Sequence, residues 1–170
     1  MLKNKKILMI IASNNFRDEE YQRPREIFER EGLEVTVAST SLNESKGMLG
    51  LIVTPDILLK DVKVDDYDAV VFVGGSGATE YWDNDKAHEI VKDTYNKKKV
   101  LAAICIAPIT LAKAGLLKDK NATVYSSEIE HLKKLDVIYT GKSVEVDGLI
   151  VTANGPSSAK EFGEKILTLL

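Results

Sequence analysis

Apolar runs of strand length alternate along this chain with amphipathic stretches of helix length, and this alternation most restricts its fold. Residues 5–13 (KKILMIIAS), 33–40, 67–75 (YDAVVFVGG) and 100–104 read as strands, and the last two are apolar almost throughout. Strands that are covered by helices on both faces lose the apolar–polar alternation of a half-exposed strand. Strands alternating with helices predict a mostly parallel, doubly wound α/β sheet with right-handed crossovers.

The remaining segments complete a single domain over residues 1–170, without repeats or linkers. Segment 143–153 (SVEVDGLIVTA) alternates around Asp147-Gly148, which predicts a C-terminal β-hairpin. Segment 50–62 predicts a short β excursion, with Pro55 restricted to an edge or a turn. Amphipathic patterns predict helices within residues 17–32, 83–99, 107–115, 128–135 and 157–170, and two further short strands flank the fourth of these helices.

Local signals predict where the helices begin and end. Gly32 is the expected glycine just after the first helix. Asp83 is the expected N-cap of the second helix, and Ser157 or Ser158 that of the last. The lysines of segment 96–99 (NKKK) predict a solvated helix end, where cations suit the helix dipole.

Composition excludes several classes of partner. The chain has 170 residues, a net charge of −3 and a pI of about 5.5, so no basic surface indicates nucleic acid or an anionic membrane. The apolar run from Ile7 to Ala12 is too short for a signal peptide or a membrane span. One cysteine excludes an internal disulfide, and we therefore expect a cytoplasmic protein. No Cys/His set has metal-ligand spacing, so we expect neither a metal nor a cofactor.

Three loops stand out at the carboxyl ends of predicted strands, where sites form in doubly wound sheets. They follow Ala12, Val73 and Ile104. The third holds the single cysteine, Cys105, between Ala103 and Ala107.

The cysteine segment, AICIA, has the small-x-nucleophile-x-small pattern of a nucleophile elbow. Small residues are needed because the tight strand-to-helix turn leaves no room two positions either side of Cys105. The helix that follows would stabilise a thiolate, and Pro108 fits its first turn. A buried structural cysteine is the alternative interpretation.

The first loop carries Asp18, Glu19 and Glu20 in a predicted helix start, where acids are favoured in any case. Glu20 differs because Pro24 follows four residues later and should kink the helix at its carbonyl. We hypothesise that Glu20 is aimed at Cys105 and that burial keeps it protonated, so that it donates a hydrogen bond to a thiolate of lowered pKa.

The glycine loop, VVFVGGSGATEYW, matches neither of the phosphate-binding glycine patterns. Glycines do allow backbone N–H groups to approach a reacting oxygen or sulfur oxide closely. We expect the amides of Gly75 and Ile106 to form an oxyanion hole. Tyr81 and Trp82 follow this loop and would line either a pocket, a dimer contact or the core.

Together, in this order, these loops resemble the ThiJ/PfpI superfamily. The resemblance covers nearly the whole chain, through FRDEEYQRP, YDAVVFVGGSGA, VLAAICIAPITLAKAGLLKDK and VDGLIVTANGPSSAKEF. It implies a flavodoxin-like three-layer sandwich, usually a homo-oligomer, with a reactive elbow cysteine. The family's cysteine falls on Cys105, its glutamate on Glu20 and its oxyanion glycine on Gly75.

The chain differs from the family at the position of the histidine that serves as catalytic base. Peptidase-like members place a histidine directly after the cysteine, where this chain has Ile106, and other branches place one where Tyr125 and Ser126 stand. The two histidines present, His88 and His131, read as exposed surface residues. A Cys-His dyad is therefore not expected.

Three functions remain open. The first is a cysteine-dependent, glyoxalase- or deglycase-like enzyme that acts on small reactive carbonyls. The second is a redox sensor or chaperone working through oxidation of Cys105, and the third, disfavoured, is a PfpI-type intracellular cysteine peptidase. The expected partners are a small electrophile or peroxide and further copies of the chain, with no nucleic acid and no membrane.

Overall fold

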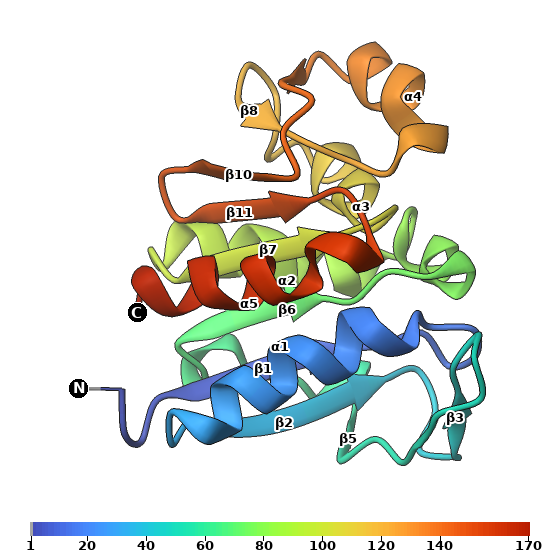
Figure 1. The fold of residues 1–170 in the computed structure, drawn as a ribbon, viewed down its shortest axis with the longest axis vertical. Coiled ribbons are helices and arrows are strands. Elements are labelled where there is room, and N and C mark those ends of the chain that lie inside the picture. Colours follow the sequence, from blue (N-terminus) through green and yellow to red (C-terminus); the bar gives the residue numbers. More distant parts are fainter. Residues whose placement is uncertain (1) are drawn as a thin grey trace.

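A computed structural model describes residues 2–170 and has the expected α/β architecture, a seven-stranded sheet between two layers of helices (Figure 1). The strand order is β10-β11-β7-β6-β1-β2-β5, and every pair in it is parallel except β10 with β11. The bounds are β1 (Lys6–Ile10), β2 (Glu34–Ser39), β5 (Ile57–Leu58), β6 (Ala69–Phe72), β7 (Val100–Ile104), β10 (Val144–Asp147) and β11 (Ile150–Ala153). The flavodoxin-like, doubly wound fold is thus confirmed.

The helices divide between the two faces of the sheet. Figure 1 shows α1 (Asp18–Arg30) and α5 (Ala159–Thr168) side by side in front of the sheet, with α2 (Asp85–Asn96) and α3 (Pro108–Lys113) behind it. Within β1, Ile7 and Met9 pack with the α1 and α5 side, and Leu8 and Ile10 pack with the other. The strand is buried on both faces, which explains its continuous apolar sequence.

Two excursions contain short strands that lie outside the main sheet. One contains the two-stranded pair β3 (Ser45–Lys46) and β4 (Ile52–Val53). The other contains α4 (Ile129–Lys134) between β8 (Asn121–Ala122) and β9 (Ile138–Tyr139), the short strands expected around that helix. Short 3₁₀ helices occupy Leu59–Asp61, Val64–Asp66, Ser76–Tyr81, Ser126–Glu128 and Pro156–Ser158.

Several expected helix and hairpin ends need correction. The N-cap of α2 is Asn84, whose side-chain oxygen accepts from the Ala87 amide at 2.9 Å, and not Asp83, which instead pairs with Lys113. Ser158 occupies the N-cap position of α5, but its hydroxyl donates to Asn154 rather than capping the helix.

The C-terminal hairpin turns one residue later than expected. Asp147 pairs with Ile150, so the two-residue loop is Gly148-Leu149. Gly148 has φ +61°, and a glycine at the first position of the loop provides that conformation without strain. The glycine predicted after the first helix is confirmed, because Gly32 follows the C-cap of α1 with φ +83°.

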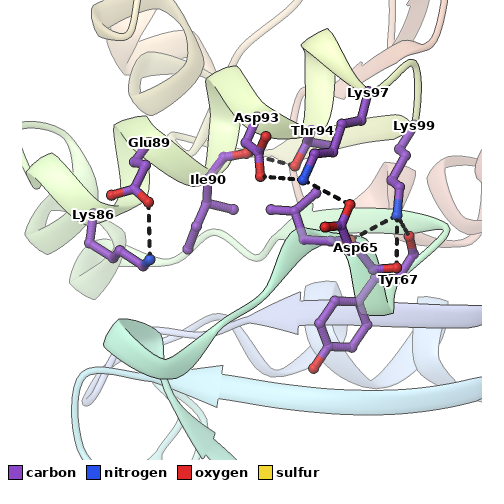
Figure 2. A network of polar contacts seen from close by, with 10 residues as sticks. Asp65, Tyr67, Lys86, Glu89, Ile90, Asp93, Thr94, Lys97 and Lys99 are labelled. Carbon is purple, nitrogen blue, oxygen red and sulfur yellow. Dashed lines mark hydrogen bonds and ion pairs between the residues drawn. The ribbon is translucent and has the colours of Figure 1, made fainter.

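The lysines after α2 are not a simple solvated helix end (Figure 2). Lys97 bridges Asp65 at 2.8 Å and Asp93 at 3.2 Å. The Lys99 ammonium group donates to the carbonyls of Val64, Asp65 and Tyr67, and so fixes the 3₁₀ turn before β6. Lys97 and Lys98 are exposed as expected, whereas Lys99 departs from the expectation because it binds carbonyls far away in the sequence.

No helix between residues 2 and 170 combines the length and the apolar character needed to cross a bilayer.

Candidate active site at the cysteine turn

The backbone of Cys105 is in the left-handed region, with φ +65°, directly after the end of β7. Its N–H donates to the Ala153 carbonyl at 2.9 Å, and its own carbonyl accepts from the Tyr125 amide at 2.9 Å. A non-glycine residue with this φ is strained and persists only when its surroundings fix it. The nucleophile-elbow geometry predicted from the small flanking residues is therefore present.

Two backbone amides stabilise the ionised form of the Cys105 sulfur. The N–H groups of Gly75 and Ile106 are directed at the Cys105 side chain and lower the pKa of its thiol. The peptide carbonyl in front of each amide is itself an acceptor, Gly74 from the Arg17 N–H at 2.9 Å and Cys105 from the Tyr125 N–H. Such hydrogen bonds polarise the peptide and strengthen its N–H as a donor. The structure thus brings both expected oxyanion donors to the sulfur.

The helix dipole contributes less than expected, because α3 is only six residues long. Individual amides are the stabilising groups around the sulfur.

Glu20 and Cys105 meet over Gly74, a position that has no room for a side chain. A Cβ built on Gly74 would lie 2.4 Å from Glu20 Oε1 and 2.5 Å from Cys105 Cβ. The carboxyl group and the cysteine therefore flank the same point, as hypothesised from the sequence. Glu20 lies in the first turn of α1 and is fully buried.

Burial dominates the titration of Glu20 and raises its pKa to about 8. The Cys105 thiol and the charge of Arg17 lower it, but by less. In the described part of the chain neither oxygen of Glu20 has a well-formed hydrogen bond, so nothing there compensates an ionised carboxylate. Glu20 is consequently protonated at neutral pH.

The lowered pKa expected for the Cys105 thiol needs a correction. Burial raises the pKa of this thiol to about 12, and an ionised Glu20 beside it adds to the increase, while the two amides oppose it. Because Glu20 is neutral below about pH 8, that negative neighbour is absent at pH 7. Its O–H is then free to donate to the sulfur, so a thiolate forms more readily while Glu20 keeps its proton.

The sulfur opens onto a cavity of about 320 Å³. Cys105 is only 7% exposed, and that small fraction faces this cavity. Two-thirds or more of the lining is apolar, as in most small-molecule sites. The lining residues are Arg17, Met48, Gly75, Ser76, Thr79, Trp82, Cys105, Ile106, Tyr125, Ser127, Glu128 and Pro156.

Several lining residues were not predicted from the sequence. Arg17 brings a guanidinium group, which pairs with Glu19 at 2.7 Å. Met48 comes from the β3–β4 loop, which Asp18 holds by accepting from the amides of Leu49 at 2.9 Å and Leu51 at 2.8 Å. The position of Arg17 beside the first loop was a signal that could have been used, whereas nothing in the sequence indicates Met48.

The two histidines are half-buried rather than exposed, and both contact Trp82. A ring nitrogen of His88 lies 2.7 Å from the Trp82 carbonyl, and the His131 ring packs edge-on against the indole with centroids 5.3 Å apart. Trp82 itself lines the cavity and donates from Nε1 to the Ile106 carbonyl at 3.1 Å. Tyr81 is a core residue, with its hydroxyl on the Ile11 carbonyl. Within residues 2–170, no histidine lines the cavity.

Comparison with known proteins places these features in context. Residues 5–169 match the model of the DJ-1/PfpI family. An uncharacterised protein of Methanocaldococcus jannaschii is 50% identical over 98% of this chain and 82% of its own length. A deglycase of Pyrococcus abyssi is 30% identical over 96% of this chain and 98% of its own length. A glutathione-independent glyoxalase of Caenorhabditis elegans is 25% identical over 100% of this chain and 91% of its own length.

A solved structure agrees with these relatives. The crystal structure of a ThiJ/PfpI domain protein from Brachyspira murdochii superimposes with a TM-score of 0.95 and is 34% identical. The match covers 98% of this chain and 96% of the other.

The buried carboxyl predicts an unusual pH dependence of stability. The pKa of Glu20 is raised from 4.5 to about 8 on folding, so the folded chain holds an extra proton between these values. This contribution is fully present below about pH 4.5 and is lost as the pH rises through about 8. Each unit of pKa difference between the folded and unfolded states corresponds to about 1.4 kcal/mol. The unfolding free energy of wild-type protein should therefore fall by several kcal/mol between these two pH values, relative to that of Glu20→Gln.

Urea unfolding at about pH 5 and about pH 8 measures this difference. Glu19→Gln, at a neighbouring carboxylate that is 30% exposed, is the matched control and should follow wild type. Parallel pH dependence of wild type and Glu20→Gln would show that Glu20 is ionised in the folded state.

Proposed function

Because the chain belongs to the DJ-1/PfpI family, we propose that it is a cysteine-dependent, glyoxalase- or deglycase-like enzyme acting on small reactive carbonyls such as 2-oxoaldehydes. Relatives named deglycase and glyoxalase align over nearly its full length. The observation that carries the proposal is the sulfur of Cys105, which faces a small cavity with two amides and a protonated carboxyl beside it.

The first chemical step follows from this arrangement. The sulfur attacks the aldehyde carbon, a C–S bond forms, and the electron pair of the C=O bond moves to oxygen. The amides of Gly75 and Ile106 are the donors available to the developing oxyanion, and Glu20 is the acid that neutralises it. The product is a hemithioacetal on Cys105. The thiol loses its proton in the same step, and Glu20 takes that proton as it gives its own to the oxygen, so Glu20 is un-ionised again at the end.

A peptidase is the less favoured assignment. Cysteine peptidases activate the thiol with an adjacent imidazole. Ile106 stands where that histidine would be, and the cavity lining in the described residues contains no histidine.

A redox sensor is the second candidate, favoured by the same two amides. Two molecules of peroxide would each transfer one oxygen to the Cys105 thiolate, giving a sulfinate and two molecules of water. The amides of Gly75 and Ile106 and the Glu20 O–H are suitable donors for the sulfinate oxygens. These donors stabilise the sulfinate and so favour arrest before the sulfonic acid.

Replacing the nucleophile tests the enzymatic proposal. We expect wild-type protein to convert methylglyoxal to lactate, and Cys105→Ser to lose about 1000-fold or more of that rate, because an alcohol beside a neutral acid is a poor nucleophile. Lactate formation is measured with equally folded samples, checked by thermal unfolding. Equal rates in the two proteins would end the proposal.

Mild peroxide treatment tests the redox candidate. Intact-mass and peptide analysis should locate a two-oxygen adduct on Cys105. Met48, a residue that is 43% exposed and lines the same cavity, is expected to gain at most one oxygen, and to do so equally in Cys105→Ser. A Cys105 that remains unmodified, or that passes directly to the sulfonic acid, counts against a sensor.

A further inference from the structure

The cavity contains an acid–base group that the first step does not use. Glu20 is fully buried and does not line the cavity, so it reaches only the sulfur and the C–O group that the sulfur attacks. Conversion of a 2-oxoaldehyde to a 2-hydroxy acid also moves a hydrogen between two carbon atoms, further from the sulfur. Within residues 2–170, Glu128 carries the only carboxyl group among the lining residues.

The Glu128 carboxylate is held in place at both oxygens. The Ser127 hydroxyl donates to Oε2 at 3.0 Å, and His131 Nδ1 lies 3.2 Å from Oε1. The Glu128 side chain is 19% exposed and that of His131 is 31% exposed. The His131 ring is packed against the Trp82 indole, itself a wall of the cavity. A carboxylate fixed in this way is oriented without movement when a substrate arrives.

We propose that Glu128 is a second catalytic acid–base residue of this site and that His131 is its positioning residue. This inference rests on the proposed function. The carboxylate–imidazole pair provides the base that the missing histidine beside Cys105 would otherwise supply. It lies on the 3₁₀ turn Ser126–Glu128 and the start of α4, whose chain is joined to the elbow by the Tyr125 N–H bond to the Cys105 carbonyl.

The steps after the hemithioacetal balance with Glu128 as the acid–base group. The Glu128 carboxylate removes the proton from C1, the C1–H pair forms a C1=C2 bond, and the carbonyl pair at C2 moves to its oxygen, which takes the proton of the hydroxyl group on C1. Glu128 then returns its proton to C2, and the C1–O bond becomes a C=O bond. The result is a 2-hydroxyacyl thioester on Cys105. Water then attacks that carbonyl and its proton passes to Glu128. The C–S bond breaks with its electron pair on sulfur, the 2-hydroxy acid gives its proton to that sulfur as it leaves, and Glu128 releases its proton to solvent.

Substitution of Glu128 separates this role from a structural one. Glu128→Gln should lower kcat for lactate formation from methylglyoxal by about 100-fold or more, with KM changed by less than about threefold. The rate at which iodoacetamide alkylates Cys105 should stay at the wild-type value, since the sulfur's own neighbours are intact. With substrate deuterated at C1, the variant should show a larger isotope effect on kcat than wild type, because removal of that proton becomes rate-limiting.

Matched variants complete the test. Glu130→Gln, at an exposed carboxylate two residues away that pairs with Lys133, should behave as wild type. His131→Leu should lower kcat about tenfold, and His131→Asn, which retains an N–H near the position of Nδ1, should restore most of it.

The outcomes distinguish the two proposals. If wild-type protein forms lactate and Glu128→Gln forms it within about twofold of that rate, Glu128 is not an acid–base residue and the proposed function stands. A loss of kcat with an unchanged isotope effect also overturns the assignment, because proton transfer is then not the step affected. If wild-type protein forms no lactate, both proposals fall.

Discussion

The left-handed backbone at Cys105 is the constraint on which the rest of the site depends. It holds because β7 lies between β6 and β11, with Ala103 beside Phe72 and Ile104 beside Ala153, so the Cys105 N–H continues the ladder to the Ala153 carbonyl. The turn that results places the sulfur among amides and over Gly74. Any side chain at Gly74 would separate Cys105 from Glu20. The pair formed by Cys105 and Glu20 therefore needs both the strained turn at Cys105 and a glycine at position 74.

The pair also works against the stability of the fold. A fully buried carboxyl without a well-formed hydrogen bond costs about 1–3 kcal/mol, and an ionised one costs more. Tight packing of α1 against α5 offsets such costs, with Gly163 allowing Pro24 to approach closely. While Glu20 is neutral, the only negative charge the pair can carry is a thiolate on Cys105, whose formation the amides of Gly75 and Ile106 favour. Stability and reactivity therefore depend on the same proton.

Local sequence signals predicted the parts of the molecule that local physics determines. The apolar strand pattern predicted the sheet, and the small residues around Cys105 predicted the elbow. Pro24, four residues after Glu20, indicated that this glutamate differs from its acidic neighbours. The errors concern side chains whose partners come from elsewhere in the chain. Lys99 binds carbonyls more than thirty residues away, and Met48 enters the cavity through a loop held by Asp18. Glu128 lines the same cavity as Cys105 only after the 121–139 excursion folds back. Periodicity carries no information on such contacts.

The measurement that tests the central claim most directly is the pH dependence of iodoacetamide alkylation of Cys105 in wild type and in Glu20→Leu. Leucine removes the O–H donor and leaves no group that can ionise. The account predicts that the thiol pKa rises by about one unit or more in Glu20→Leu, because the thiolate loses a hydrogen bond that only a protonated Glu20 supplies. An unchanged or lower thiol pKa would contradict it, since Glu20 would then act as a negative charge that opposes the thiolate.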